Sequence, residues 1–241
     1  MNLKVIYKPK GRAGEYSEYA LNIYNGCDFG CKYCFCPLVL KKDRTLFHNS
    51  ITERVDFIAK VESDCVKLAG NTEKVLLCFT CDPYNSLDLK EGTTRKVLEL
   101  FKKYNINFQI LTKSGNRAKR DFDLYKPGDA FASTLTFVDE IKSKEWEPNA
   151  PLPKDRMETL KYAHELGIET WVSLEPVVDP AESLKLIELT HEYVDLYKVG
   201  IINYNELKNT IDWKAFGTEA IRLLEMYGKK YYIKDDLKKY L

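Results

Sequence analysis

Residues 20–36 read ALNIYNGCDFGCKYCFC, an apolar run followed at once by four cysteines. The apolar part, residues 20–24, is typical of a buried strand. Three of the cysteines have the spacing C-x3-C-x2-C and the fourth follows two residues later: Cys27, Cys31, Cys34 and Cys36. Gly26 and Gly30 allow the backbone between them to turn tightly around a bound group. The stretch therefore predicts a strand whose carboxyl end carries a ligand-binding loop of thiols.

Strand-like and helix-like segments alternate about six times along the chain. Apolar runs predict further strands at residues 75–79, 107–112, 130–137, 168–174 and 195–202. Amphipathic runs predict helices at residues 93–104, 118–125, 154–166, 179–193 and 212–228. A further helix is predicted to begin at Ser50, where SITE has the form of a capping box. This alternation predicts parallel strands joined by crossover helices, in a barrel, a partial barrel or an open doubly wound sheet.

Polar residues follow the predicted strands directly. The segments after successive strands include TCDPYN, KSGNR, EPVVD and NYN. Because the carboxyl ends of parallel strands meet at one edge, and α/β folds carry their sites there, we expect these segments to surround the thiol loop.

The composition is that of an ordinary globular protein of 241 residues, with 44% hydrophobic and 30% charged residues. A formal net charge of +1 gives no general attraction to nucleic acid, which is therefore a possible partner that the charge does not indicate. No apolar run approaches the roughly 20 residues of a membrane span, and the first residues lack a secretory signal core. We expect a cytoplasmic protein with no membrane partner, whose cysteines are reduced.

Three thiolates on one loop can hold three irons of a [4Fe–4S] cluster, which normally takes four cysteine ligands. With Tyr33 before its last cysteine, the loop resembles the signature of radical S-adenosylmethionine (SAM) enzymes. The likeness extends over roughly residues 22–202 to the spore photoproduct lyase-like branch of that superfamily. The segments that carry it are NIYNGC, TCDPY, TTRKVLEL, LTKS, KRDFDL, EWEPNAPLPKDRMETL and HELGI.

The resemblance implies an α/β fold, a partial (β/α)6 barrel of the radical SAM type. We expect a single domain over residues 1–241, with its core at about 18–205 and a C-terminal helical extension at 206–241.

Two cofactors are implied by the same resemblance: a [4Fe–4S] cluster on Cys27, Cys31 and Cys34, and SAM on the iron left open. An electron from the cluster would cleave SAM to a 5′-deoxyadenosyl radical, which abstracts hydrogen from a substrate. We therefore expect a radical SAM enzyme with an unidentified substrate and an electron donor such as flavodoxin or ferredoxin. Tyr33, beside Cys34, is counted with the SAM-binding residues.

Five residues of the strand edge are further candidates for binding SAM. By resemblance, Lys113 contacts the methionine carboxylate, and Ser133 binds the same ligand. Thr80 and Asp82 stand where many radical enzymes hold the methionine amino group, and Glu175 faces the adenosyl part or the substrate. The alternatives are a solvated lysine, a serine bonded to nearby backbone and an Asp-Pro turn.

Cys78 and Cys81 are the catalytic candidates. Spore photoproduct lyases carry a cysteine hydrogen-atom donor directly before a T-S-D sequence, whereas Phe79 stands there when TCD is aligned. Because successive strand side chains face opposite ways, Cys78 and Phe79 are expected to point apart. Cys81 lies beyond the predicted strand, where it could donate a hydrogen atom, form a redox pair with Cys78 or fill space.

Two other metal sites compete with the three-cysteine cluster. Two C-x2-C pairs could bind zinc, although their separation far exceeds the usual gap of about 15–20 residues; they are Cys31, Cys34, Cys78 and Cys81. Cys36 could also be a fourth ligand of a closed cluster or of zinc; otherwise it is buried, as we expect of Cys65. Either site would make the chain a non-catalytic metal-binding module, with nucleic acid as one conceivable ligand.

Within the enzyme class, the alternative is a DNA photolesion lyase. We expect no repair of spore photoproduct in duplex DNA, because Phe79 stands at the donor position and little sequence precedes the cluster strand or follows the sixth unit. A net charge of +1 also fits poorly with the several phosphate contacts of duplex binding. Base extrusion requires a wedge, which no segment supplies.

Overall fold

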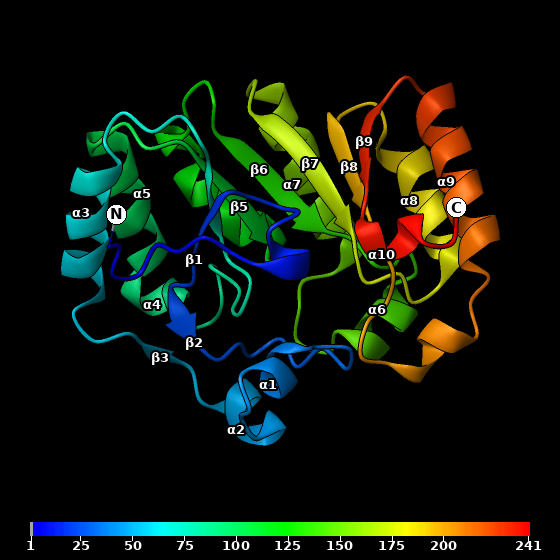
Figure 1. Ribbon diagram of the computed structural model, residues 1–241, viewed down its shortest axis with the longest axis horizontal. Coiled ribbons are helices and arrows are strands. Elements are labelled where there is room, and N and C mark those ends of the chain that lie inside the picture. Colours follow the sequence, from blue (N-terminus) through cyan, green and yellow to red (C-terminus); the bar gives the residue numbers. More distant parts are fainter. Residues whose placement is uncertain (1) are drawn as a thin grey trace.

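A sheet of seven parallel strands forms the centre of the computed structural model, which describes residues 2–241 (Figure 1). The strands lie in the order β1-β4-β5-β6-β7-β8-β9. Their bounds are β1 Tyr19–Leu21, β4 Val75–Leu77, β5 Phe108–Thr112, β6 Ala130–Thr134, β7 Glu169–Leu174, β8 Leu196–Val199 and β9 Lys230–Ile233. A separate antiparallel ribbon pairs β2 (Tyr24–Asn25) with β3 (Thr52–Glu53).

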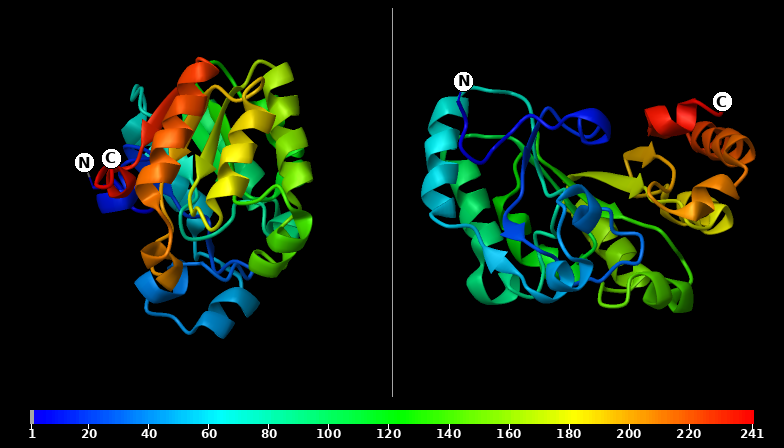
Figure 2. Two further views of the ribbon diagram at one scale, coloured as in Figure 1. Left: turned by 90° about the vertical axis from the view of Figure 1, so that its right-hand side faces the viewer. Right: turned by 60° about the horizontal axis from the view of Figure 1, so that its bottom comes forward.

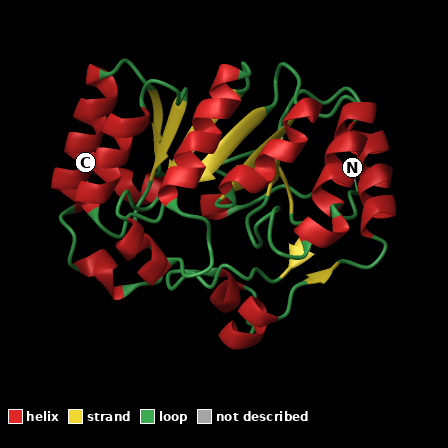
Figure 3. Ribbon diagram, turned by 180° about the vertical axis from the view of Figure 1, so that it is seen from behind, coloured by secondary structure: helices red, strands yellow, loops and turns green. Residues whose placement is uncertain are grey.

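Helices cover the outer face of the sheet and lie in front of the strands in Figure 3. The long ones are α3 Phe57–Leu68, α5 Thr93–Lys103, the 3-10 helix η2 Gly115–Leu124, α7 Pro153–Glu165, α8 Pro180–Thr190 and α9 Trp213–Met226. The short ones are η1 Gly11–Ala13, α1 Cys36–Val39, α2 Arg44–Asn49, α4 Asp88–Glu91, α6 Glu140–Trp146, η3 Glu206–Asn209 and α10 Asp235–Lys238. Within residues 2–241, no helix combines the length and the apolar character needed to cross a bilayer.

The two faces of the sheet carry separate hydrophobic clusters, because strand side chains alternate. Val75 and Leu77 of β4 belong to the large cluster beneath the helices, whereas Leu76 belongs to a smaller one on the inner face. Small residues of β6 leave room there for Trp171 and for Tyr16 of the N-terminal segment. The inner face is thus filled by side chains below the strand ends.

The N-terminal segment crosses the inner face of the open sheet and bonds to β5, β8 and α10. The Tyr16 carbonyl accepts hydrogen bonds from Lys198 Nζ (2.8 Å) and Gln109 Nε2 (3.1 Å). The Glu15 carboxylate accepts one from the Asp235 amide (2.7 Å) at the start of α10. Figure 2 accordingly shows this segment beside α10. The result is a partial barrel whose open side is covered by the chain's own ends.

The α/β class and the radical SAM type of partial barrel are confirmed, but the sheet has seven strands where six were predicted. Residues 206–241, predicted to be helical, contain β9 as well as helices, because the KYYI stretch pairs with β8. The helix predicted at Ser50 is wrong. Ser50 directly follows α2, and the next residues form β3, so that the helix begins only at Phe57.

Candidate active site

A cavity of about 500 Å³ lies at the carboxyl ends of the strands, where the sequence predicted the chemistry. Each strand of the sheet is followed by a lining residue in the segment after it or, for β6, ends on one. One from each is Cys27 after β1 and β2, Cys81 after β4, Lys113 after β5, Thr134 at the end of β6, Glu175 after β7, Asn203 after β8 and Lys234 after β9.

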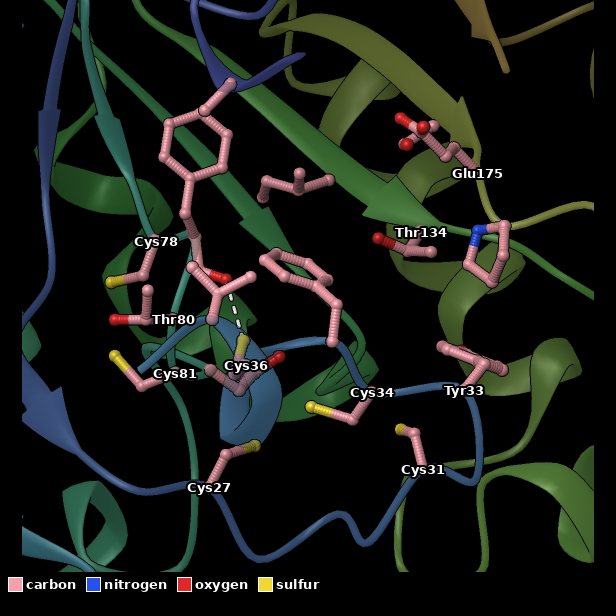
Figure 4. Close-up of a pocket in the computed structure, with 18 of the residues that line it drawn as sticks. Cys27, Cys31, Tyr33, Cys34, Cys36, Cys78, Thr80, Cys81, Thr134 and Glu175 are labelled. Carbon is pink, nitrogen blue, oxygen red and sulfur yellow. Dashed lines mark hydrogen bonds between the residues drawn. The ribbon is translucent and has the colours of Figure 1, made fainter. Parts of the chain in front are cut away.

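The thiol loop forms one wall of this cavity. Cys27, Cys31 and Cys34 project from it around a shared space, with Cys36 above them (Figure 4). The four thiols are free, so that no disulfide removes a ligand. Burial raises the pKa of Cys31 to about 11 and that of Cys27 well above its usual range, so these two thiols keep their protons until a metal displaces them.

Cys34 differs from the other two thiols. The adjacent Cys36 thiol lowers the pKa of Cys34 against the opposing effect of burial, and His48 adds to the lowering. Since the thiolate is the form that binds metal, this loop offers one ready thiolate and two buried thiols. The donor set fits an iron–sulfur cluster, and the shared space lies open to the rest of the cavity.

Two side chains of helix α2 hold the thiol loop in place by contacting the loop's backbone carbonyl groups. Arg44 donates to the carbonyl oxygens of Lys32 (2.8 Å), Cys34 (3.1 Å) and Cys31, and His48 Nδ1 lies 2.7 Å from the Cys27 carbonyl oxygen. The sequence analysis missed Arg44 and placed no function on His48. Neither has a motif of its own, because both act on backbone atoms that carry no sequence signature.

Gly26 allows the loop to approach α2 closely. Its φ is +88°, and a Cβ at this position would lie 2.6 Å from the Ser50 carbonyl oxygen and 2.8 Å from that of Phe47. Both the backbone conformation and the space therefore require glycine directly before the first cysteine.

The other side of the loop rests on a buried ion pair. Arg156 Nη2 and Glu147 Oε2 lie 2.5 Å apart, and Tyr33 donates its hydroxyl to the same carboxylate. Burial alone would raise the pKa of Glu147, but Arg156 and Lys113 lower it overall. Glu147 and Arg156 belong to the segment EWEPNAPLPKDRMETL, so this part of the resemblance corresponds to support for Tyr33 beneath the thiols.

Lys113 supplies a positive charge to the cavity. Its ammonium lies 5.6 Å from the centre of the Tyr33 ring, close enough for a cation–π contact. Burial alone would lower the pKa of Lys113, but Cys31 and Glu147 outweigh it and raise the pKa. The side chain is therefore a permanent cation that faces the space beside the thiols.

The Asp82 carboxylate positions the backbone of Lys113. Its Oδ2 accepts from the Lys113 amide (2.8 Å), and its Oδ1 accepts from the hydroxyls of Thr112 (2.7 Å) and Ser114 (2.8 Å) and from the Tyr84 amide (2.9 Å). This carboxylate ties the loop after β4 to the loop after β5. Asp82 also lines the cavity, and its contact with the methionine amino group of SAM stays a prediction.

Thr80 lines the cavity, and Asn22 holds the backbone of Thr80 in this position. The Asn22 side-chain oxygen accepts hydrogen bonds from the amides of Phe79 (2.8 Å) and Thr80 (2.9 Å). Asn22 is the first residue of the NIYNGC segment, so this asparagine links the strand before the thiols to the loop after β4.

Ser133 does not line the cavity, contrary to the prediction. Its hydroxyl donates to the Thr112 carbonyl (3.0 Å) between neighbouring strands, and Thr134 lines the cavity instead. The two residues are adjacent on β6 and face opposite ways, so the prediction was one position early.

Cys78 and Cys81 both line the cavity, on the opposite side from Cys31 (Figure 4). Strand β4 ends at Leu77, so the alternation expected between Cys78 and Phe79 does not apply, and Phe79 lines the cavity as well. The Tyr24 amide donates to Cys81 Sγ (3.4 Å), which fixes that thiol at the wall. Within residues 2–241, no three Cys, His, Asp or Glu side chains converge tightly enough to enclose a single metal ion.

Glu175 lies at the far end of the cavity in a polar network. Its carboxylate accepts from the Tyr16 hydroxyl (2.5 Å), from Lys234 Nζ (2.6 Å) and from the Asn203 amide (3.5 Å). Lys234 is only 2% exposed and was missed because the short strand β9 before it was not recognised. If β9 had been predicted, the expectation that polar site residues follow strands would have included Lys234.

Comparison with known proteins agrees with this geometry. A family model described as the radical SAM superfamily matches residues 21–194. An uncharacterized protein of Methanocaldococcus jannaschii is 26% identical over 205 residues, covering 83% of this chain and 75% of that protein. An uncharacterized protein of Acidianus two-tailed virus is 29% identical over 190 residues, covering 73% of this chain and 62% of that protein.

Solved structures of low sequence identity share the fold. Spore photoproduct lyase complexed with dinucleoside spore photoproduct matches with a TM-score of 0.72 and 14% identity, over 96% of this chain and 78% of that one. Streptococcus suis SuiB bound to precursor peptide SuiA matches with a TM-score of 0.68 and 15% identity, over 92% of this chain and 50% of that one.

Proposed function

The chain belongs to the radical SAM superfamily, and from this premise we propose that its thiol loop holds a [4Fe–4S] cluster through Cys27, Cys31 and Cys34. The observation that carries the proposal is the projection of three free thiols from one clamped loop into an open cavity. When bound, the cluster supplies the electron that cleaves SAM to a 5′-deoxyadenosyl radical, which abstracts hydrogen from a substrate.

Residues beside the thiols are suited to bind SAM. Lys113, in contact with the Tyr33 ring, offers a fixed cation to the methionine carboxylate, and Thr80 lines the same cavity. Asp82 acts as a positioning residue, because it binds the Lys113 backbone. Glu175, at the far end of the cavity, is assigned to contact with the adenosyl group or the substrate.

The walls exclude water from a reactive intermediate. Apolar side chains that line the cavity include Phe29, Phe35, Phe79, Leu111 and Ile201. A radical on carbon is protected in such surroundings, which suits the protein's part in radical chemistry: orientation and exclusion of solvent.

We propose a small or flexible substrate that enters the cavity, and not a lesion within duplex DNA. The fold is compatible with both kinds, since one structural neighbour is complexed with a dinucleoside and another with a precursor peptide. The net charge of +1 favours the first kind. Incubation of reduced enzyme and SAM with lesion-bearing duplex should restore no thymine above background by mass spectrometry; restoration would establish the lyase alternative.

The enzyme proposal is tested by anaerobic reconstitution with iron and sulfide. Reduced protein should contain about four irons per chain and convert SAM slowly to 5′-deoxyadenosine and methionine without substrate. Cys31→Ala should lose both iron and conversion, whereas Cys36→Ala should retain both. Stoichiometric zinc in place of iron, with no conversion, would establish the non-catalytic metal-binding alternative.

A further inference from the structure

An exposed apolar surface lies directly beside the thiol loop. We define the α1–α2 patch as the exposed residues of this segment, which are Phe35, Leu38, Val39, Leu40, Lys41, Lys42 and Leu46. Leu38 is 62% and Leu46 67% exposed, and the helices α1 and α2 stand away from the sheet at the bottom of Figure 1. Large apolar side chains gathered in this way mark an interaction surface.

The patch is held in this exposed form by its own backbone. The amides of Leu40 and Lys42 donate to the carbonyls of Cys36 (2.9 Å) and Pro37 (2.9 Å), and Asp43 caps α2 at the Leu46 amide (2.9 Å). The segment is therefore a preformed surface, which keeps its apolar side chains outward without a rearrangement.

The charge of the patch is basic. Residues 35–46 contain Lys41, Lys42 and Arg44 against one acidic residue, Asp43, and all four are exposed. The Arg44 guanidinium donates to carbonyl oxygens of the thiol loop, so Lys41 and Lys42 supply the outward positive charge of this rim. An apolar centre with a basic rim complements an acidic protein partner.

The patch is connected to the proposed cluster ligands through covalent and hydrogen bonds. Phe35 separates Cys34 from Cys36, and both Phe35 and Val39 line the cavity as well as reaching the surface. Arg44 of α2 donates to the Cys34 carbonyl (3.1 Å). A redox centre seated on this surface would be separated from the thiol loop by a single layer of side chains.

We propose that the α1–α2 patch is the docking surface for a small acidic flavoprotein that delivers the electron. The proposal rests on the proposed function, because only a redox-active group on the thiol loop requires this delivery. In the step itself the reduced flavin loses one electron and the group bound to Cys27, Cys31 and Cys34 gains it, with no proton transferred.

The test compares two charge reversals in the cluster-loaded protein. Lys41→Glu/Lys42→Glu changes the patch; Lys185→Glu/Lys214→Glu makes the same charge change on exposed residues of α8 and α9, on the far side of the sheet. All four lysines are exposed, so both variants should fold. The probe is an acidic flavodoxin, oxidised for calorimetry and reduced for stopped-flow oxidation.

We expect the patch variant to weaken flavodoxin binding about tenfold and to slow electron transfer similarly, and the control to change either by less than about threefold. Added salt should weaken wild-type binding and affect the patch variant less. Equal behaviour of the two variants, no binding by wild type, or a dimer by light scattering that the patch variant abolishes would each overturn the docking proposal. Dithionite separates the two claims: with it both variants should form 5′-deoxyadenosine normally, and failure of wild type there would refute the proposed function instead.

Discussion

The Glu147 carboxylate and the Arg156 guanidinium lie 2.5 Å apart beneath the thiol loop, and each residue is only 1% exposed. The same carboxylate accepts the Tyr33 hydroxyl, and Arg156 also donates to the carbonyls of Pro151 (2.8 Å) and Thr134 (3.2 Å). The pair thus connects the thiol loop to the end of β6. It supports the site without touching the open space of the cavity.

Arg156→Met should therefore destabilise the protein severely. It leaves the Glu147 charge buried without its partner, which costs about 3–5 kcal/mol. Urea unfolding of the metal-free protein measures the loss. Lys154→Ala, which removes an exposed pair with Glu158, should change stability by less than about 0.5 kcal/mol. A loss below about 1 kcal/mol for Arg156→Met would show that the pair does not hold the loop.

Lys113→Ala should weaken SAM binding. If the ammonium bonds the methionine carboxylate, the loss is about 1–3 kcal/mol by calorimetry on cluster-loaded protein. Lys119→Ala, in the 3-10 helix η2 that follows Lys113 and outside the cavity lining, is the matched control and should bind SAM as wild type does. Unchanged affinity for Lys113→Ala would reject the contact.

Cys81 should donate a hydrogen atom when no substrate is present. In D2O the thiol exchanges to S–D, and transfer of that deuterium to the 5′-deoxyadenosyl radical leaves a thiyl radical and a deuterated 5′-deoxyadenosine. Cys81→Ala should lower the deuterium content by mass spectrometry, whereas Cys65→Ala, buried away from the cavity, should not. Equal deuterium in wild type and Cys81→Ala would assign Cys81 to packing alone.

Lys198 should make stability depend on pH. Burial, aided by Lys234, lowers the pKa of Lys198 to about 8, whereas the unfolded value is about 10.4. Between these values the unfolded chain binds more protons, so the folded state gains stability as pH rises. Relative to Lys198→Met, wild type should gain about 2–3 kcal/mol between pH 7 and pH 10 in urea unfolding. Parallel curves for the two proteins would contradict the shift, and exposed Lys185→Met should run parallel to wild type.

The alternation of apolar and amphipathic runs was enough to predict the sheet, its parallel order and the edge that carries the site. Cysteine spacing was enough to predict the thiol loop, because ligands on one loop must be close in sequence. Residues that act across the fold left no such pattern. Arg44 and His48 bind carbonyl groups, and Lys234 follows a strand of four residues that is too short to recognise.

Single-residue placement on strands was the weaker part of the prediction. Ser133 and Thr134 are both plausible hydroxyls, and only the end of β6 decides which one faces the cavity. Cys78 was assigned a direction from a strand that ends one residue earlier, at Leu77. The capping box at Ser50 was overruled by pairing of β2 with β3, a contact between segments far apart in sequence.

Other parts of the resemblance correspond to support for the site. Asp88 accepts from the Tyr24 hydroxyl (2.6 Å) and the Thr94 amide (2.8 Å), and it pairs with Arg120. These residues come from the segments NIYNGC, TTRKVLEL and KRDFDL. The buried carboxylate thus joins three of the segments behind the thiol loop.

The central claim is that three cysteines hold a four-iron cluster with one iron left open for SAM. Mössbauer spectroscopy of protein reconstituted with 57Fe tests it most directly. Addition of SAM should change the signal of about one iron in four and leave the others unchanged, in wild type and in Cys36→Ala. A spectrum that SAM leaves unaltered, or one in which Cys36→Ala alone loses the cluster, would contradict the claim.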